Sequence, residues 1–243
     1  MIFGNFIFIF ILIGFKSFII NKILIGQIWY ILFFTLIYSG RQSKNICFIF
    51  LLISLFNKSV QGLYELGSVF KVFTAAAVLE EGLVTPGTLI DTTSPIWWGK
   101  HKISNHHRLP DELSFTDVIV ESSNTGTSRL AKELGAKHQK DFLRSLGFFS
   151  NTGIELIEGE HISSKYPENW SEISTMTISY GHGISSSPLH VASAFATLLN
   201  GGTRVRPTLL KSDGQSSIGD RIISTSVSNA LVKILHQVVD RGT

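Results

Sequence analysis

The first 64 residues of this 243-residue chain contain no aspartate or glutamate. They do contain five basic residues, which are Lys16, Lys22, Arg41, Lys44 and Lys58. Since these contribute +5 and the whole chain has a formal net charge of +3, the part from Glu65 to Thr243 carries −2. The positive excess therefore belongs to an apolar segment, and the sequence indicates no nucleic-acid partner.

Cysteine is nearly absent as well. The single Cys47 excludes a disulfide framework within the chain and a cysteine-rich zinc site. His106 and His107 are adjacent, His182 lies in a glycine-flanked turn, and no His-x-x-x-His or carboxylate spacing accompanies them. We therefore expect these histidines to be loop residues, with no metal site and no bound cofactor.

Long apolar runs fill residues 1–56, in which Ile, Phe and Leu dominate. A bilayer crossing needs roughly 20 apolar residues, and Ile23–Gly40, with Trp29 and Tyr30 or Tyr38 near its ends, comes closest. We interpret 1–56 as a membrane-embedded segment with apolar transmembrane helices and at least one crossing. A second interpretation stays open: AT-rich DNA read out of frame would encode a similar stretch, in which case the segment is non-native.

A different composition begins near Asn57, with balanced charge and regular Gly and Pro punctuation. We expect residues 57–243 to form an α+β domain made mainly of helices. The patterns predict helices over 68–81, 114–120, 127–134, 139–146, 189–199 and 224–239, with Ser114 or Thr116 capping the second. Short strands are predicted over 88–91 and 102–104 around a bend at Trp97–Gly99, and 166–170 is predicted as a loop.

The predicted helix from Ser68 to Glu81 contains no Pro or Gly, ends at Gly82 and is apolar on nearly every face. Such a helix is expected to be buried. Lys71 follows Ser68 by three residues and so shares its face. Burial disfavours the charged lysine and should lower its pKa. A neutral amine beside a hydroxyl is a base beside a nucleophile.

A simpler interpretation competes with catalysis here. A lone Ser-x-x-Lys pattern is weak, since most such lysines lie at the surface or extend toward water. Likewise, Ser122 and Asn124 match an ordinary helix cap, because Ser and Asn are favoured at that position. The apolar helix around Lys71, together with the motifs downstream, favours the catalytic interpretation.

Ser68-x-x-Lys71 followed by Ser122-x-Asn124 resembles the first two motifs of the penicillin-binding transpeptidase and β-lactamase superfamily. Tyr64–Lys71 (YELGSVFK) is similar to the YEPGSxFK signature of class B penicillin-binding proteins, with Leu66 where proline is usual. The match is closest to the division or elongation transpeptidases. Further matching stretches follow in the family's order across 57–243: Glu80–Pro86, Ser122–Gly126, Ser179–Ile184 with Pro188–Leu189, Asn200–Gly202 and Arg206–Pro207.

The resemblance implies a partial penicillin-binding transpeptidase fold, similar to that of the serine β-lactamases, and a role for each motif residue. Ser68 would attack the penultimate D-Ala of a peptidoglycan stem peptide and form an acyl-enzyme, and Lys71 would take its proton. Ser122 would relay a proton to the leaving group, and the Asn124 amide would bind the substrate backbone. β-Lactams would acylate Ser68 as mimics of D-Ala-D-Ala.

The same resemblance implies where the protein acts and with what. The protein would sit in the bacterial inner (cytoplasmic) membrane, with residues 57–243 on the periplasmic, cell-wall side. Its partners would be stem peptides, β-lactams, the membrane and other division or cell-wall synthesis proteins.

Two departures from the family pattern bear on activity. No Lys-Thr-Gly or Lys-Ser-Gly follows Asn124, and an apolar segment stands where the family has a pedestal domain. We therefore expect an incomplete transpeptidase domain, truncated before the third motif, with one side of the Ser68 helix exposed or covered by the N-terminal segment. Whether the chain is an enzyme stays open, and weak or undetectable β-lactam labelling is expected, because losing even one oxyanion donor lowers rates about 10²–10³-fold.

Two alternatives to the transpeptidase interpretation remain. One is a D,D-carboxypeptidase or serine β-lactamase. The other is a non-catalytic membrane protein whose transpeptidase-like domain only binds, as a β-lactam sensor or a division partner.

Overall fold

The computed structural model describes residues 56–211 and 219–242. The chain divides into two units, Met1–Phe56 and Asn57–Thr243, so that all described residues except Phe56 belong to the second. Within the described ranges, no helix combines the length and the apolar character that a bilayer crossing requires. The transmembrane helices predicted within 1–56 lie outside the described residues, which include only Phe56 of that segment.

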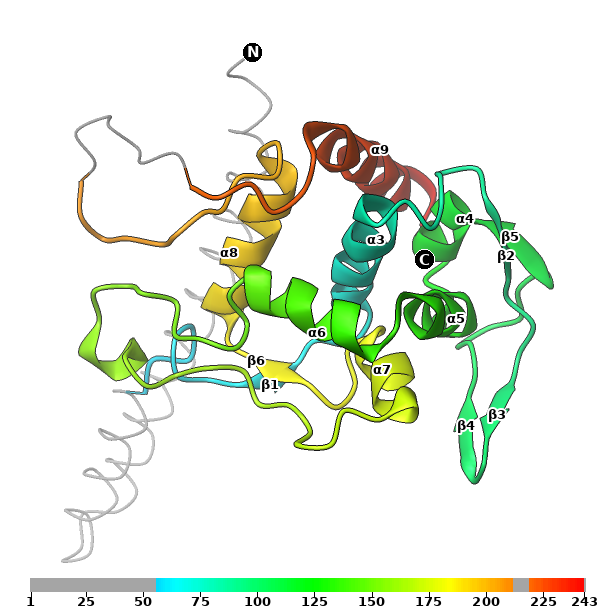
Figure 1. Ribbon diagram of the computed structural model, residues 1–243, viewed down its shortest axis with the longest axis horizontal. Helices are drawn as coiled ribbons and strands as arrows, with labels where there is room; N and C mark the ends of the chain where they lie inside the picture. Colours follow the sequence, from blue (N-terminus) through cyan, green and yellow to red (C-terminus); the bar gives the residue numbers. More distant parts are fainter. Residues whose placement is uncertain (1–55, 212–218, 243) are drawn as a thin grey trace, which may run out of the picture. The chain divides into compact units, whose positions relative to one another are not determined.

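Helix α3 (Lys71–Glu80) is central to the second unit and follows directly on a 3₁₀ turn, η1 (Gly67–Phe70). Every residue from 71 to 79 is buried, as expected of a helix that is apolar on all sides. Four helices pack against it (Figure 1): α4 (Phe115–Val120), α5 (Asn124–Leu134), α6 (Ala136–Ser145) and α9 (Thr225–Arg241). The expectation of an exposed side was therefore wrong, because these helices surround α3.

An aromatic cluster forms part of the core beside α3. The Phe73 ring lies 5.1 Å from the rings of Phe70, Phe148 and Phe195, measured between centroids, and all three pairs are edge-to-face. Such pairs contribute about 0.5–1.5 kcal/mol each beyond their buried area. Phe195 belongs to helix α8 (Pro188–Leu199), so this cluster joins α8 to the central helix.

The strands are short and lie in three separate antiparallel pairs. Strand β1 (Tyr64–Glu65) pairs with β6 (Ser185–Ser186), β2 (Leu89–Asp91) with β5 (Glu112–Ser114), and β3 (Ile96–Trp98) with β4 (His101–Ile103). The bend predicted at Trp97–Gly99 was misplaced, since Trp97 and Trp98 belong to β3 and the turn falls at Gly99–Lys100. Gly99 adopts a φ of 58°, a left-handed value that glycine allows at no steric cost.

Serine side chains fix where the helices begin. Ser114, one of the two predicted candidates, caps α4. Its Oγ accepts a hydrogen bond from Asp117 N at 3.1 Å. Ser123 caps α5, which therefore begins three residues earlier than predicted. The remaining serine caps are Ser171 for α7 (Glu172–Ile178), Ser187 for α8 and Ser224 for α9.

Three local elements differ from the predictions. Helix α6 begins at Ala136, directly after Gly135, and not at residue 139. Helix α7 and the short 3₁₀ turn η2 (Ile157–Gly159) were not predicted. The main features of the prediction hold: the second unit is α+β, and helices make up most of its regular secondary structure.

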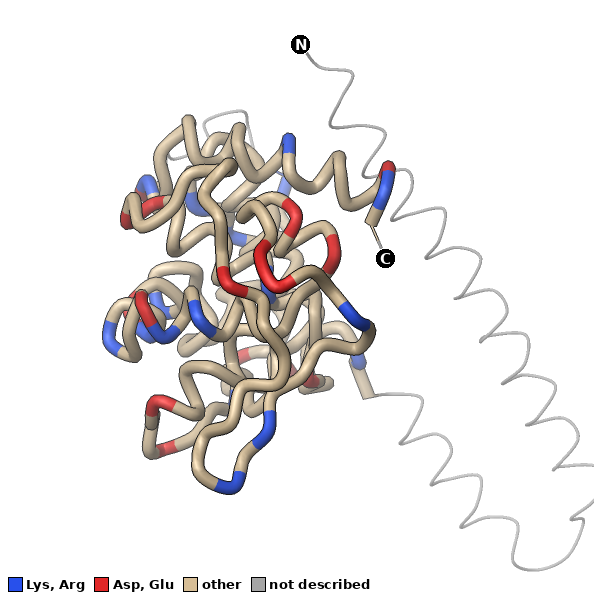
Figure 2. Tube along the Cα trace, turned by 90° about the vertical axis from the view of Figure 1, so that its right-hand side faces the viewer, with Lys and Arg blue, Asp and Glu red and all other residues tan. Residues whose placement is uncertain are grey.

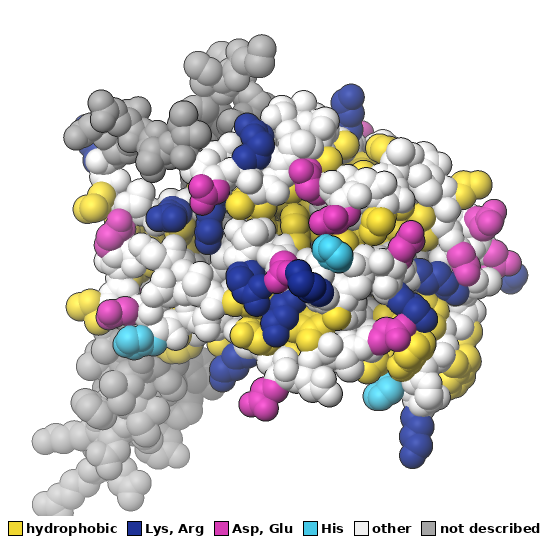
Figure 3. Space-filling view, in the orientation of Figure 1, with side chains coloured by type: hydrophobic (Ala, Val, Ile, Leu, Met, Phe, Trp, Pro, Cys, Tyr) yellow, Lys and Arg dark blue, Asp and Glu magenta, His cyan; other side chains and the backbone are white. Residues whose placement is uncertain are grey.

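Charged residues of both signs are interspersed along the trace on the side shown in Figure 2. Figure 3 shows Lys and Arg side chains gathered over α6 with hydrophobic side chains around them. Lys140 Nζ lies 5.5 Å from the ring centroid of Tyr166 and 5.6 Å from that of Trp170. This cluster is therefore a cation–π arrangement that packs α6 onto the 166–170 loop.

Candidate active site

Ser68 and Lys71 lie at the junction of η1 and α3. The Ser68 side chain is on the exposed 3₁₀ turn, whereas Lys71 is only 2% exposed. Lys71 Nζ is 3.2 Å from Ser68 Oγ. The predicted arrangement, a buried lysine on the same face as a serine hydroxyl, is therefore present.

Ser122 completes this group from a different part of the chain. It lies between α4 and α5, and its Oγ is 2.8 Å from Lys71 Nζ. The Ser122 carbonyl oxygen accepts a further hydrogen bond from Nζ. Ser122 has a φ of 55°, the only left-handed value at a non-glycine position in the described ranges. A φ of this kind is uncommon for serine and often marks a functional site.

The surroundings of Lys71 change its protonation. Burial lowers its pKa from 10.5 to about 7, because an ammonium loses its hydration in a packed interior. No carboxylate contacts Nζ among the described residues; its partners are the Ser68 and Ser122 oxygens. Near pH 7 a large share of the side chain is therefore the neutral amine, which can act as a base toward Ser68.

Asn124 is the first residue of α5 and is largely buried. Its Nδ2 donates a hydrogen bond to the Ser104 carbonyl at 3.0 Å. Asn124 Oδ1 accepts no hydrogen bond from the described residues. The structure thus links Ser68, Lys71 and Ser122 by direct hydrogen bonds, and holds Asn124 beside them through the loop that follows β4.

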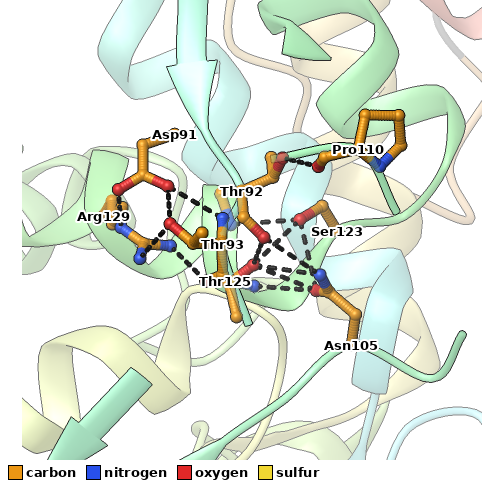
Figure 4. A network of polar contacts seen from close by, with 9 residues as sticks. Asp91, Thr92, Thr93, Asn105, Pro110, Ser123, Thr125 and Arg129 are labelled. Carbon is orange, nitrogen blue, oxygen red and sulfur yellow. Dashed lines mark hydrogen bonds and ion pairs between the residues drawn. The ribbon is translucent and has the colours of Figure 1, made fainter. Parts of the chain in front are cut away.

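A polar network around Asn105 holds Ser123 and Thr125, the two neighbours of Asn124 in the chain (Figure 4). Asn105 Oδ1 accepts hydrogen bonds from Ser123 Oγ at 3.2 Å and from Thr125 N at 3.1 Å. Thr125 Oγ1 donates to the Thr92 carbonyl at 2.8 Å. Asn105 therefore ties down both residues that flank Asn124. Asn105 was not predicted as part of the site, because nothing in its local sequence indicates this long-range contact.

A second support lies on the other side of Ser68, where the turn at 180–183 contacts the backbone of Gly67. A Cβ on Gly181 would lie 2.1 Å from the Gly67 carbonyl oxygen, so only glycine fits there. Glu65 accepts hydrogen bonds from Gly183 N at 2.9 Å and from His182 Nδ1 at 3.2 Å. The hydrogen bond from Gly183 N is the main reason that the pKa of Glu65 is lowered. The segment Ser179–Ile184 therefore packs against Gly67, the residue before Ser68.

Across 56–211 and 219–242, no three or more His, Cys, Asp or Glu side chains come together in a way that could hold a metal ion. His182, predicted as a loop residue, lies in that turn and forms an ion pair with Glu65 when it is protonated.

The comparison with protein families defines the class. Residues 35–243 match the model described as the penicillin binding protein transpeptidase domain, and the chain belongs to this family, in its class B branch. The matching residues include the whole Ser68–Lys71–Ser122 group. The fold is accordingly the α+β penicillin-binding transpeptidase fold, covered in part.

Particular relatives agree with this class. The chain is 32% identical over 188 residues to the probable peptidoglycan D,D-transpeptidase FtsI of Caulobacter vibrioides, which covers 76% of this chain and 31% of that protein. It is 33% identical over 198 residues to the penicillin-binding protein PbpB of Mycolicibacterium smegmatis, covering 76% and 30%. The chain therefore spans about a third of the length of the curated relatives it matches.

Solved structures give the same fold. The transpeptidase domain of Burkholderia pseudomallei penicillin-binding protein 3 superposes with a TM-score of 0.71 at 24% identity, covering 76% of this chain and 57% of that one. Penicillin-binding protein 3 of Mycobacterium tuberculosis, complexed with aztreonam, gives a TM-score of 0.68 at 27% identity, covering 76% and 44%.

Proposed function

We propose that this chain is a peptidoglycan D,D-transpeptidase-like, penicillin-binding protein in which Ser68 forms an acyl-enzyme. The observation that carries this proposal is the position of Lys71 Nζ, which is buried and within hydrogen-bond distance of both Ser68 Oγ and Ser122 Oγ. The names of the matched relatives, which include peptidoglycan D,D-transpeptidases, support the choice of substrate.

The first chemical step would be acylation. The neutral Lys71 amine takes the Ser68 proton while Ser68 Oγ attacks the carbonyl carbon of the penultimate D-Ala. No side chain caps η1; Gly67 N donates to the Gly181 carbonyl at 3.4 Å, and the Ser68 N–H in the first turn would stabilise the oxyanion. The C–N bond to the terminal D-Ala then breaks. The proton passes from Lys71 through Ser122 Oγ to the departing amine, so that the acyl-enzyme and free D-Ala result.

The second step would transfer the acyl group. An amine of another stem peptide attacks the ester carbonyl, its proton returns through Ser122 and Lys71 to Ser68 Oγ, and a cross-link forms. A β-lactam would follow only the first step, because its ring nitrogen stays attached to the acyl group. Asn124, whose Oδ1 is free of hydrogen bonds from the described residues, would bind an N–H of the substrate backbone.

Labelling with a fluorescent penicillin tests this proposal. We expect slow labelling of the full chain that is lost in Ser68→Ala and strongly reduced in Lys71→Gln. Ser226→Ala is the control, since Ser226 is an exposed serine on α9 that lies outside this group. Equal labelling of the wild type and Ser68→Ala would overturn the proposal. Displaceable, non-covalent binding would instead indicate a binding domain, such as a β-lactam sensor.

We further propose that residues 57–243 face the cell-wall side of the bacterial cytoplasmic membrane. The support is chemical: the stem peptides that Ser68 would acylate are exposed on that side. Protease added to intact spheroplasts should digest this part of the chain. Complete protection of residues 57–243, in spheroplasts that become sensitive after lysis, would contradict the proposed location.

A further inference from the structure

A polar cavity of about 210 Å³ lies between the end of α6, helix α8 and the segment after α8. It is larger than a cavity of roughly 150 Å³ that accommodates benzene in another protein. Two arginines, Arg204 and Arg206, line it together with the hydroxyl and amide side chains of the 150–152 loop. None of the proposed catalytic residues lines it. The cavity is therefore a separate feature of the fold.

The lining of this cavity has positive charge and no negative charge. Its lining contains two arginines and no aspartate or glutamate. Within the described ranges, neither guanidinium forms an ion pair or donates a hydrogen bond. Most other arginine side chains in these ranges do have partners, such as Asp91 for Arg129 and Asp117 for Arg241. Among the described residues, the N–H donors of these two guanidinium groups have no acceptor, so they are available to a bound acceptor.

The backbone places both arginines on the same side. Val205 N donates to Thr197 Oγ1 at 2.9 Å, and the Val205 carbonyl accepts from Ser193 Oγ at 2.7 Å. These two bonds to α8 fix the segment at its middle residue. Arg204 and Arg206 stand on either side of that residue, and both residues line the cavity.

The opposite wall is also held firmly. His190 is 4% exposed, and burial lowers its pKa, so the ring is neutral. Its Nε2 lies 2.8 Å from the Ser150 carbonyl, which can only accept, so Nε2 carries the proton and Nδ1 accepts from Ser187 Oγ at 2.7 Å. The 150–152 loop is thereby tied to α8.

Gly147 leaves room for the Arg204 side chain. A Cβ at Gly147 would lie 3.1 Å from Arg204 Nη2. The absence of a side chain there allows the guanidinium to lie directly on the loop backbone. Gly147 has a φ of 90°, so the turn itself also favours glycine.

We propose that this cavity is an anion-binding site that takes a phosphate or carboxylate group through Arg204 and Arg206. Planar guanidinium groups bind both kinds of oxyanion through paired N–H donors. The Thr152 hydroxyl and the Asn151 amide, which also line the cavity, offer further polar contacts. The site is independent of Ser68, and its loss leaves the acylation chemistry unchanged.

Calorimetric titration of the full chain, kept in a non-ionic detergent, tests the proposal. Inorganic phosphate and acetate are the probes, with chloride at matched ionic strength as the reference. We expect saturable binding of one anion per chain. Stronger binding of phosphate assigns the site to phosphate-bearing ligands, and stronger binding of acetate assigns it to carboxylates. A response equal to that of chloride overturns the proposal.

Variants identify the residues responsible. Arg206→Gln, at an exposed position, should weaken binding by about tenfold, because it removes a charge-assisted hydrogen bond to the anion. Arg206→Lys should retain part of the affinity, since it keeps the charge but not the fork of donors. Lys233→Gln removes the same charge from an exposed position on α9 and should change nothing. Unchanged binding in Arg206→Gln, with or without Arg204→Gln, would contradict the proposal.

Discussion

Replacing Lys71 by methionine should change how the stability of the fold depends on pH. Lys71 is 2% exposed, and burial lowers its pKa from 10.5 to about 7. Between these two pH values, the unfolded chain holds a proton that the folded chain has already released. The free energy of unfolding therefore rises with pH across this window. Methionine has a similar shape and no titrating group, so this contribution disappears in the variant.

The size of the effect follows from the difference between these two pKa values. Each pKa unit corresponds to about 1.4 kcal/mol, so the buried lysine destabilises the fold by roughly 4 kcal/mol at pH 7 and by roughly 2 kcal/mol at pH 9. We therefore expect the wild type to gain about 2 kcal/mol more than Lys71→Met between pH 7 and pH 9. Comparing the two proteins removes the contributions of the other titrating groups.

Urea unfolding of the full chain at pH 7, 8 and 9, followed by tryptophan fluorescence, measures this difference. Lys233→Met is the control, because Lys233 is exposed on α9, and it should follow the wild type. If Lys71→Met shows the same pH dependence as the wild type, Lys71 is not held with a lowered pKa. The proposed role of Lys71 as a neutral base would then lose its physical basis.

Three further predictions concern Ser114, His190 and Gly181. Ser114→Ala should lower the free energy of unfolding, measured in urea, by about 1 kcal/mol, because α4 loses its N-cap. An unchanged free energy of unfolding would mean that the cap is dispensable. The pKa of His190 is lowered by burial, so stability should fall as the pH drops below about 6.5; His190→Gln should flatten this slope in thermal melts, and an unchanged slope would contradict it. Gly181→Ala should slow penicillin labelling with little loss of secondary structure by circular dichroism, since its Cβ would displace Gly67; normal labelling would show that this contact does not position Ser68.

The local parts of the site were predictable from the sequence. The spacing of Ser68 and Lys71 places them on one face, and the apolar residues around Lys71 indicate its burial. Both features are present in the structure. They depend only on helix periodicity and on the cost of burying a charge, which short stretches of sequence encode.

The long-range parts were not predictable from local patterns. Ser122 meets Lys71 across 51 positions, and only the family resemblance placed it in the site. Its left-handed backbone and the contacts of Asn105 depend on how α4, α5 and the loop after β4 come together. The exposed side expected on α3 was wrong for the same reason: helix α9 was predicted, but the sequence did not show that it packs there.

The predicted helix boundaries were wrong where an N-cap residue outweighed the helix propensity of the residues that follow it. Helix α5 begins at Asn124 because Ser123 Oγ accepts from Gly126 N at 3.1 Å, although Thr and Gly in that first turn are poor helix formers. Helix α7 was missed because its sequence, EISTMTI, is rich in β-branched residues. Its Ser171 cap and its packing against α5 stabilise it in spite of that composition.

Mass spectrometry of the β-lactam adduct, followed over time at several pH values, is the most direct test of the central claim. We expect a slow adduct of one β-lactam per chain on the peptide that contains Ser68, absent from Ser68→Ala. Its rate of formation should rise with pH through about 7, as Lys71 loses its proton. An adduct on another residue, an adduct that persists in Ser68→Ala, or a rate independent of pH between 6 and 8 would contradict the account.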